Sequence, residues 1–147
     1  MTPSPEKPRV LILCTGNSAR SQMAEGLLRH LGGARYGVFS AGTKPVRVNP
    51  LAIEVMREKG IDIASQRSKS VADFSGQPFA MVITVCDHAA EQCPVFPEAK
   101  RLHWSLPDPA AVSGTAQERL TAFRRVRDEL ERRISSFLKS EISATRS

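Results

Sequence analysis

The chain has 147 residues, a net charge of +6 and a composition of 41% hydrophobic and 24% charged residues, which suits one domain with a single core and leaves too little chain for two. Its basic residues gather late, in ERLTAFRRVRDELERR, with acidic residues between them; this is typical of a solvated helix face and argues against nucleic acid binding. No apolar run approaches the roughly 18 residues that span a bilayer, and MTPSPEKPR lacks the apolar stretch of a signal peptide, so we expect a cytoplasmic protein that does not enter a membrane.

Four short apolar runs predict β-strands at residues 9–13, 36–41, 79–85 and 101–104, and the third is apolar enough to be buried on both faces. Helical patterns lie between and after them. The first covers 19–31 and is followed by two glycines, the second covers 49–60 and begins with Asn49 and Pro50, and the last begins at a capping box of Thr115 and Glu118.

Strands that alternate with helices predict an α/β fold of three layers, with a parallel sheet covered by helices on both faces. We expect a single domain over residues 9–139. Residues 1–8 hold three prolines without periodicity, and residues 140–147 lack an apolar pattern, so both are expected to be flexible ends.

The first chemical feature is Cys14, which ends the first strand and opens the loop CTGNSAR. Such a loop directs backbone N–H groups and a helix N-terminus toward one point, which suits a tetrahedral oxyanion and favours the thiolate form of a cysteine. Arg20, in the first turn of the next helix, can supply two parallel donors to the same anion. Alternatively, Cys14 is a buried strand-end cysteine and Arg20 a surface charge. The position of the loop between a strand and a helix favours the functional interpretation.

Other residues of this loop have possible supporting roles. Ser18 and Ser21 can donate to a thiolate, and Asn17 can hold the turn in a left-handed conformation. Either serine can equally be an ordinary helix cap.

The second feature is the pair Cys86 and Cys93 in VCDHAAEQCP. Cys86 ends the third strand, so in a parallel sheet it reaches the same edge as Cys14, and a second thiol there indicates disulfide exchange. An odd count of three cysteines does not fit a secreted disulfide framework. The alternatives are two small core residues, or half of a zinc site with His88 and His103, although C-x6-C does not match the usual short zinc spacing.

The third feature is Asp108, which lies between two prolines in LPDPAAV. A carboxyl on such a rigid loop can protonate a leaving oxygen if the loop folds over the Cys14 cradle. An ordinary aspartate in a turn is the alternative.

Together these residues resemble the low-molecular-weight protein tyrosine phosphatase superfamily and, within it, the thioredoxin-coupled arsenate reductases. The resemblance covers about residues 9–139. The C-x5-R loop and the Asp-Pro loop are shared by both branches, whereas CTGNSARSQMAEG, SAGT, VCDHAAEQCP and HWSLPDPA, in this order, favour the reductases. The family fold is a four-stranded parallel sheet flanked by helices.

The resemblance implies arsenic detoxification by reduction of arsenate to arsenite, with phosphate or sulfate as mimics of the substrate. Cys14 would attack arsenate, Asp108 would protonate the departing oxygen, and Cys86 and then Cys93 would carry the disulfide to thioredoxin. It implies no tightly bound cofactor, and we expect a monomer. The substrate would be bound by the loop residues Thr15, Gly16, Asn17, Ser18, Ala19, Arg20 and Ser21.

The spacing of the second and third cysteines sets a physical demand. A helix over residues 86–93 would separate the two α-carbons by about 10 Å, beyond the roughly 7 Å limit for a disulfide. We therefore expect this segment to be locally weak and to differ between redox states.

Two positions depart from relatives. Some carry a further cysteine where Ala19 stands, so that position is expected to be dispensable. Certain relatives bind potassium through residues that match Asn17, Glu25 and Ser40 plus an aspartate, whose place Lys69 takes here. The ammonium of Lys69 either replaces the charge of the ion or points to solvent, and we expect no metal.

Two other functions fit parts of the pattern. A phosphatase acting on phosphotyrosine or small phosphate esters would use the same Cys14, Arg20 and Asp108, but DPAAV has alanines where such enzymes usually carry aromatic residues. A non-catalytic thiol or metal-binding regulator would show stoichiometric zinc or no turnover.

Overall fold

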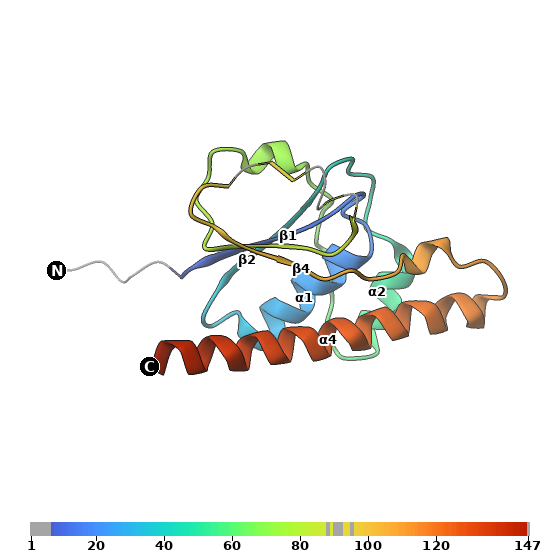
Figure 1. Ribbon diagram of the computed structural model, residues 1–147. Coiled ribbons are helices and arrows are strands. Elements are labelled where there is room, and N and C mark those ends of the chain that lie inside the picture. The colour runs from blue at the N-terminus through green and yellow to red at the C-terminus, as the bar shows by residue number, and fades with distance from the viewer. Residues whose placement is uncertain (1–6, 88, 90–92, 95, 147) are drawn as a thin grey trace.

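The computed structural model describes residues 7–146 apart from 88, 90–92 and 95. Four parallel strands form one sheet in the order β2-β1-β3-β4, which confirms the predicted parallel α/β fold (Figure 1). The strands are β1 (Arg9–Cys14), β2 (Gly37–Gly42), β3 (Met81–Thr84) and β4 (Lys100–His103). The central strand β1 is buried from Val10 onward, because its side chains are apolar on both faces.

The helices begin and end where local signals place them. They are α1 (Arg20–Gly32), α2 (Pro50–Arg57) and α4 (Ala116–Arg146), with short 3-10 helices η1 (Val71–Phe74) and η2 (Pro109–Ala111). The Asn49 side chain accepts a hydrogen bond from Leu51 N at 2.8 Å, with proline at the first helical position, as expected. At α4, Glu118 N donates to Thr115 Oγ1 and Thr115 N donates to Glu118 Oε1, which confirms the predicted capping box.

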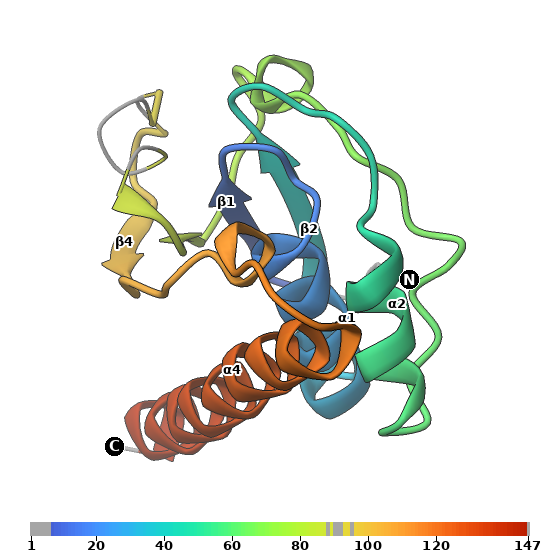
Figure 2. The same cartoon turned by 90° about the vertical axis from the view of Figure 1, so that its right-hand side faces the viewer.

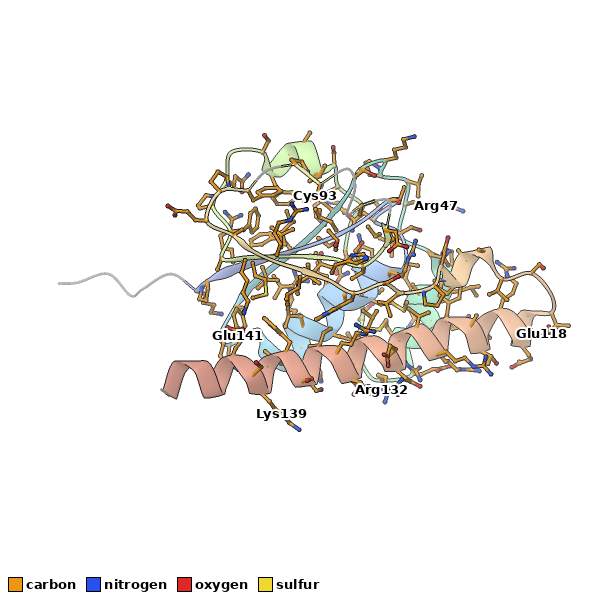
Figure 3. All side chains as sticks on the ribbon, viewed as in Figure 1. Arg47, Cys93, Glu118, Arg132, Lys139 and Glu141 are labelled. Atoms are coloured by element: carbon orange, nitrogen blue, oxygen red, sulfur yellow. The ribbon has the colours of Figure 1, made fainter. Side chains whose placement is uncertain are left out.

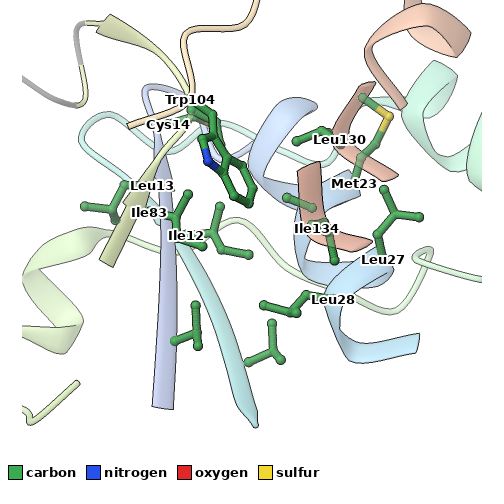
Figure 4. Packing of buried hydrophobic residues seen from close by; sticks show 14 of the residues in the cluster. Ile12, Leu13, Cys14, Met23, Leu27, Leu28, Ile83, Trp104, Leu130 and Ile134 are labelled. Atoms are coloured by element: carbon green, nitrogen blue, oxygen red, sulfur yellow. The ribbon is translucent and has the colours of Figure 1, made fainter. Parts of the chain in front are cut away.

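The long helices pack against one face of the sheet. Figure 4 shows Leu27 and Leu28 of α1 and Leu130 and Ile134 of α4 on the side of β1 that faces these helices, and all four are almost fully buried, as is Ile12 of β1. The opposite face carries η1 (Figures 1 and 2). It also carries an aromatic cluster, in which Phe39 of β2 contacts the rings of Phe74 and Phe79 edge-on. The sheet is thus covered on both sides, with α1, α2 and α4 together on one of them.

The last helix is longer than the sequence pattern indicates. It continues to Arg146, so residues 140–146 extend α4, where the sequence analysis expects a flexible end. The segment contains no glycine or proline to end a helix. At the other end, Pro8 is tied to the sheet, because its carbonyl accepts from Gly37 N at 2.9 Å. Residues 1–6 lie outside the described residues, and the single domain over 9–139 stays a prediction.

No helix within the described part of the chain combines the length and the apolar character needed to cross a membrane.

Candidate active site

The loop between β1 and α1 lies at the carboxyl edge of the sheet, where open α/β folds place their sites. Cys14 is the last residue of β1 and is 3% exposed, and α1 begins at Arg20 directly after Ala19. Asn17 has a φ of 46°, the left-handed conformation expected for it. The loop therefore turns sharply over the N-terminus of α1.

A neighbouring segment, residues 43–49, fixes the direction of this loop; we call it the strap. Its N–H groups donate to four loop carbonyls: Thr43 to Cys14 at 3.3 Å, Lys44 to Thr15 at 2.8 Å, Val46 to Gly16 at 3.0 Å and Asn49 to Ser18 at 2.9 Å. The N–H that follows each carbonyl points the opposite way in a trans peptide. Because the carbonyls face the strap, the loop amides face the other side and form an anion cradle.

The strap reaches the loop because β2 ends in a glycine. A Cβ on Gly42 would lie 2.5 Å from Thr15 O and 2.8 Å from Asn17 N, both backbone atoms. Only glycine lets the two segments approach this closely.

A chain of buried hydrogen bonds below the loop ends at the Cys14 thiol. Lys69 N donates to Asn17 Oδ1 at 2.8 Å, which orients the amide so that Nδ2 donates to Ser21 Oγ at 2.8 Å and to Ser40 Oγ at 2.9 Å. Since Ser21 Oγ accepts from Asn17, its own hydrogen is available to Cys14 Sγ, which is 2.8 Å away. The network thus supplies the Cys14 sulfur with a buried hydrogen-bond donor.

The buried Glu25 carboxylate closes the other end of this network. It accepts from Ser40 Oγ at 2.5 Å and pairs with Arg29 at 2.8 Å. Lys69 Nζ lies 3.6 Å from Glu25 Oε1 with its side chain only 23% exposed. Of the two alternatives for Lys69, the structure shows the one in which the ammonium faces the carboxylate.

The loop, the strap and the Asp108 segment enclose a cavity of about 270 Å³. Asp108 caps η2, where its Oδ1 accepts from Ala110 N at 3.0 Å. Arg20 Nη1 donates to Leu106 O at 3.0 Å, so the arginine connects α1 to the segment that carries Asp108. The residues that line this cavity are Cys14, Thr15, Gly16, Ser18, Ala19, Arg20, Val46, Asp108 and Ala110.

The structure brings Cys86 to the same loop. Because β1 and β3 are neighbours, with Val85 N bonded to Leu13 O at 2.9 Å, Cys86 follows β3 beside the start of the loop. Its Sγ lies 3.3 Å from Thr15 Oγ1 and accepts from Ala89 N at 3.4 Å. Two donors can therefore hold this sulfur next to the cradle.

Cys93 is not among the residues that line this cavity. Figure 3 shows it on the side of the sheet away from α4, where its Sγ lies 3.3 Å from Pro94 O. Burial raises the pKa of the Cys93 thiol, and the nearby Arg101 guanidinium offsets this in part. All three cysteines are free thiols. Residues 88 and 90–92 lie outside the described residues. They make up half of the expected redox-dependent segment and include His88 of the zinc alternative.

Sequence reasoning missed several residues that shape the site. The strap has no side-chain signature, since it acts through its backbone. Gln22 is fully buried and donates to Asn17 O at 3.0 Å, and Ser68 Oγ donates to the same carbonyl at 2.6 Å. In the sequence, the signal for such a role is a glutamine in the first turn of the predicted helix, next to the apolar Met23. Within the described residues no cluster of metal-ligating side chains is found.

Comparison with known proteins assigns this architecture to a family. The model of the low molecular weight phosphotyrosine protein phosphatase family matches residues 9–146, and the chain belongs to this family.

Its relatives narrow the chemistry. The arsenate reductase of Halalkalibacterium halodurans is 46% identical over 132 residues, covering 89% of this chain and 95% of that protein. An arsenate reductase solved in the phosphate binding state superposes with a TM-score of 0.74 at 34% identity, over 90% of this chain and 98% of the other. A thioredoxin-dependent arsenate reductase of Corynebacterium glutamicum superposes with a TM-score of 0.75 at 29% identity, over 93% of this chain and 63% of the other. Within the family, the present chain is an enzyme that reduces arsenate.

Proposed function

We propose that arsenate is reduced by a relay of three thiols, with Cys14 as nucleophile, Cys86 as the second thiol and Cys93 as the last. The observation that carries this proposal is the contact of Cys86 Sγ with Thr15 Oγ1 at 3.3 Å, which places a second thiol at the oxyanion loop. Hydrolysis of a phosphate ester needs only one thiol.

In the first step the Cys14 thiolate attacks arsenate bound in the cradle. The loop amides and the guanidinium of Arg20 neutralise the oxyanion, with donors fixed in place before the substrate arrives. An S–As bond forms and an oxygen leaves as water, protonated by Asp108 from the edge of the same cavity. Five of the loop residues expected to bind the substrate line the cavity that would hold the anion: Thr15, Gly16, Ser18, Ala19 and Arg20. The side chains of Asn17 and Ser21 instead belong to the buried network below the loop.

In the second step the Cys86 thiolate attacks the Cys14 sulfur. An S–S bond forms while the electron pair of the S–As bond stays on arsenic, so As(V) becomes As(III) and arsenite departs. Cys93 then attacks the Cys86 sulfur and releases Cys14 as a thiolate. The final disulfide joins Cys86 and Cys93, which requires the segment between them to change conformation when oxidised.

Thioredoxin is the proposed reductant of that disulfide. Support comes from the Corynebacterium glutamicum relative, which is named thioredoxin-dependent. Cys93 is also partly exposed and is not among the residues that line the cavity, which suits exchange with an external dithiol. The electrons come from this partner, so the cycle needs no tightly bound cofactor, and we place it in the cytoplasm, where thiols are kept reduced.

The cavity favours a small anion over an aromatic ester. Its wall beside Asp108 is formed by Ala110 and Val46, and no aromatic side chain is among its lining residues. A substrate ring would therefore find little to stack on.

The Cys93→Ser variant tests the relay. It is expected to form one equivalent of arsenite at the wild-type rate and then stop, because the Cys14–Cys86 disulfide cannot pass to thioredoxin. Rapid-quench arsenite assays, together with NADPH consumption in the presence of thioredoxin and its reductase, separate the two phases. Cys86→Ser is the matched control and should form no arsenite. Continued cycling of Cys93→Ser would refute the relay.

A further inference from the structure

The imidazole of His103 bridges the two sides of the chain around Cys86. His103 is the last residue of β4 and is paired in register with Thr84 of β3. Its Nδ1 lies 2.7 Å from Thr84 Oγ1, and its Nε2 lies 2.8 Å from Asp87 Oδ1. Thr84 precedes Cys86 by two residues and Asp87 follows it directly, so a single ring holds the chain before and after the thiol.

Each hydrogen bond of this bridge can be assigned a donor and an acceptor. An ionised carboxylate only accepts, so the proton of the ring is on Nε2 and points to Asp87. The His103 hydrogen bond is the first cause that holds the pKa of Asp87 below its ordinary value, with Ser105 and the charge of Arg20 adding to it. The Thr84 hydroxyl can donate to a neutral Nδ1, or accept from a protonated one and turn toward Leu102 O, 3.4 Å away. The bridge therefore persists in either protonation state of the ring.

The bridge matters because the sheet stops just before the thiol. Trp104 N bonds to Thr84 O at 2.8 Å and Val85 N to Leu13 O at 2.9 Å, which fixes the backbone up to residue 85. Directly after that point, the Asp87 carboxylate ties the chain to His103 at the end of β4, and it also bonds to Ser105. Since Asp87 adjoins Cys86, its position sets the backbone angles that direct Sγ toward Thr15.

The pair is also easy to open. The side chains of His103 and Asp87 are 38% and 74% exposed, and exposed ion pairs contribute little to stability. Such a contact can orient a residue without locking it. That property fits a thiol that must first face Cys14 and later turn to Cys93.

We propose that His103 is a positioning residue for Cys86: through Thr84 and Asp87 it holds the thiol at the loop for attack on the Cys14 sulfur, and its contact with Asp87 opens when Cys86 pairs with Cys93. The proposal rests on the relay described above. It adds a residue that contacts neither the substrate nor a reacting sulfur.

The test compares His103→Ala and Asp87→Ala with Asp87→Asn in the full enzyme. Single-turnover arsenite formation without thioredoxin should slow by about tenfold in the two alanine variants, as for other misplaced reacting groups. Asp87→Asn keeps an oxygen acceptor for the Nε2 hydrogen and should restore most of the rate. Iodoacetamide alkylation of Cys14, and its protection by phosphate, should stay at the wild-type level in all three when followed by peptide mass spectrometry.

The controls separate this proposal from the relay itself. His30→Ala, at an exposed histidine of α1, should behave as wild type. A wild-type rate of arsenite formation in His103→Ala and Asp87→Ala, while Cys86→Ser is inactive, would overturn the positioning role and leave the relay intact. An equal loss of phosphate protection at Cys14 would also overturn it, because the ring would then support the whole site. Arsenite formation by Cys86→Ser would instead refute the relay.

Discussion

The hydroxyl of Ser21 offers the sharpest quantitative test of the network below the loop. Its proton has one destination, because Asn17 Nδ2 donates to Ser21 Oγ at 2.8 Å and leaves the hydroxyl hydrogen for Cys14 Sγ, also at 2.8 Å. Ser21 is fully buried, so water cannot take over this role. Ser21→Ala therefore deletes one buried donor to a thiolate.

The size of the effect follows from the kind of bond. A hydrogen bond to a charged group contributes about 1.5–3 kcal/mol, and every 1.4 kcal/mol corresponds to a factor of ten. The rate at which iodoacetamide alkylates Cys14 should therefore fall by about 10- to 150-fold. The variant also leaves one N–H of the buried Asn17 without its acceptor, which should lower the free energy of unfolding by about 1–3 kcal/mol.

Alkylation kinetics measure the first quantity. In a Cys86→Ser/Cys93→Ser background Cys14 is the only thiol, since the chain has 3 cysteines. The rate of iodoacetamide alkylation of Cys14 should be lower in Ser21→Ala, and urea unfolding should report the lost stability. Ser65→Ala, at an exposed serine outside the site, is the control. An unchanged alkylation profile in a folded Ser21→Ala enzyme would refute the assignment of the hydroxyl proton to the thiolate.

Two further changes test other parts of the structure. Gly42→Ala should reduce arsenite formation by about 10²-fold in a folded protein, because its Cβ would push the loop away from the strap. Gly37→Ala on the same strand is the control, since its Cβ meets only ordinary contacts from 3.5 Å, and it should stay active. Equal activity of the two variants would contradict the close approach. Arg124 and then Arg127 lower the pKa of Glu58 from 4.5 to about 2 in the folded state, so the stabilisation from this carboxylate is complete above pH 4.5 and is lost as the pH falls toward 2. In Glu58→Gln the urea concentration at the midpoint of unfolding should fall less between pH 4.5 and 2 than in wild type, and Glu98→Gln is the control. A midpoint that falls as steeply as in wild type would show that the pair does not link α2 to α4.

The elements that could be predicted from the sequence are those with a local cause. Apolar runs mark buried strands whatever lies beside them, and the Asn49-Pro50 and Thr115-x-x-Glu118 signals act within one turn of their own helix. The placement of Cys14, Arg20 and Cys86 at one edge followed from the rule that parallel strands share their carboxyl ends. Strand boundaries shifted by a residue or two, as with β1, which includes Cys14.

The remaining features depend on contacts between distant parts of the chain. The strap bonds to the loop through backbone groups some thirty residues away, and no residue type is required for those bonds except the glycine at 42. The Lys69 ammonium could not be directed toward Glu25 or toward solvent from sequence alone, because its side chain is long enough for both. The bridge through His103 depends on the register of β3 with β4, which composition does not reveal.

The strap also determines at which step of the reaction the enzyme distinguishes arsenate from phosphate, the anion that most resembles it. Because the cradle is built by backbone bonds within the protein, it is complete before any ligand enters, and it fits every tetrahedral oxyanion of similar size and charge. Phosphate should therefore compete with arsenate for the loop. Discrimination then belongs to the redox step: a thiol can displace arsenic as As(III), whereas phosphorus has no comparably accessible lower state. A phosphate in this cradle can only occupy it and leave, so the cellular phosphate level should set how much arsenate is needed for turnover.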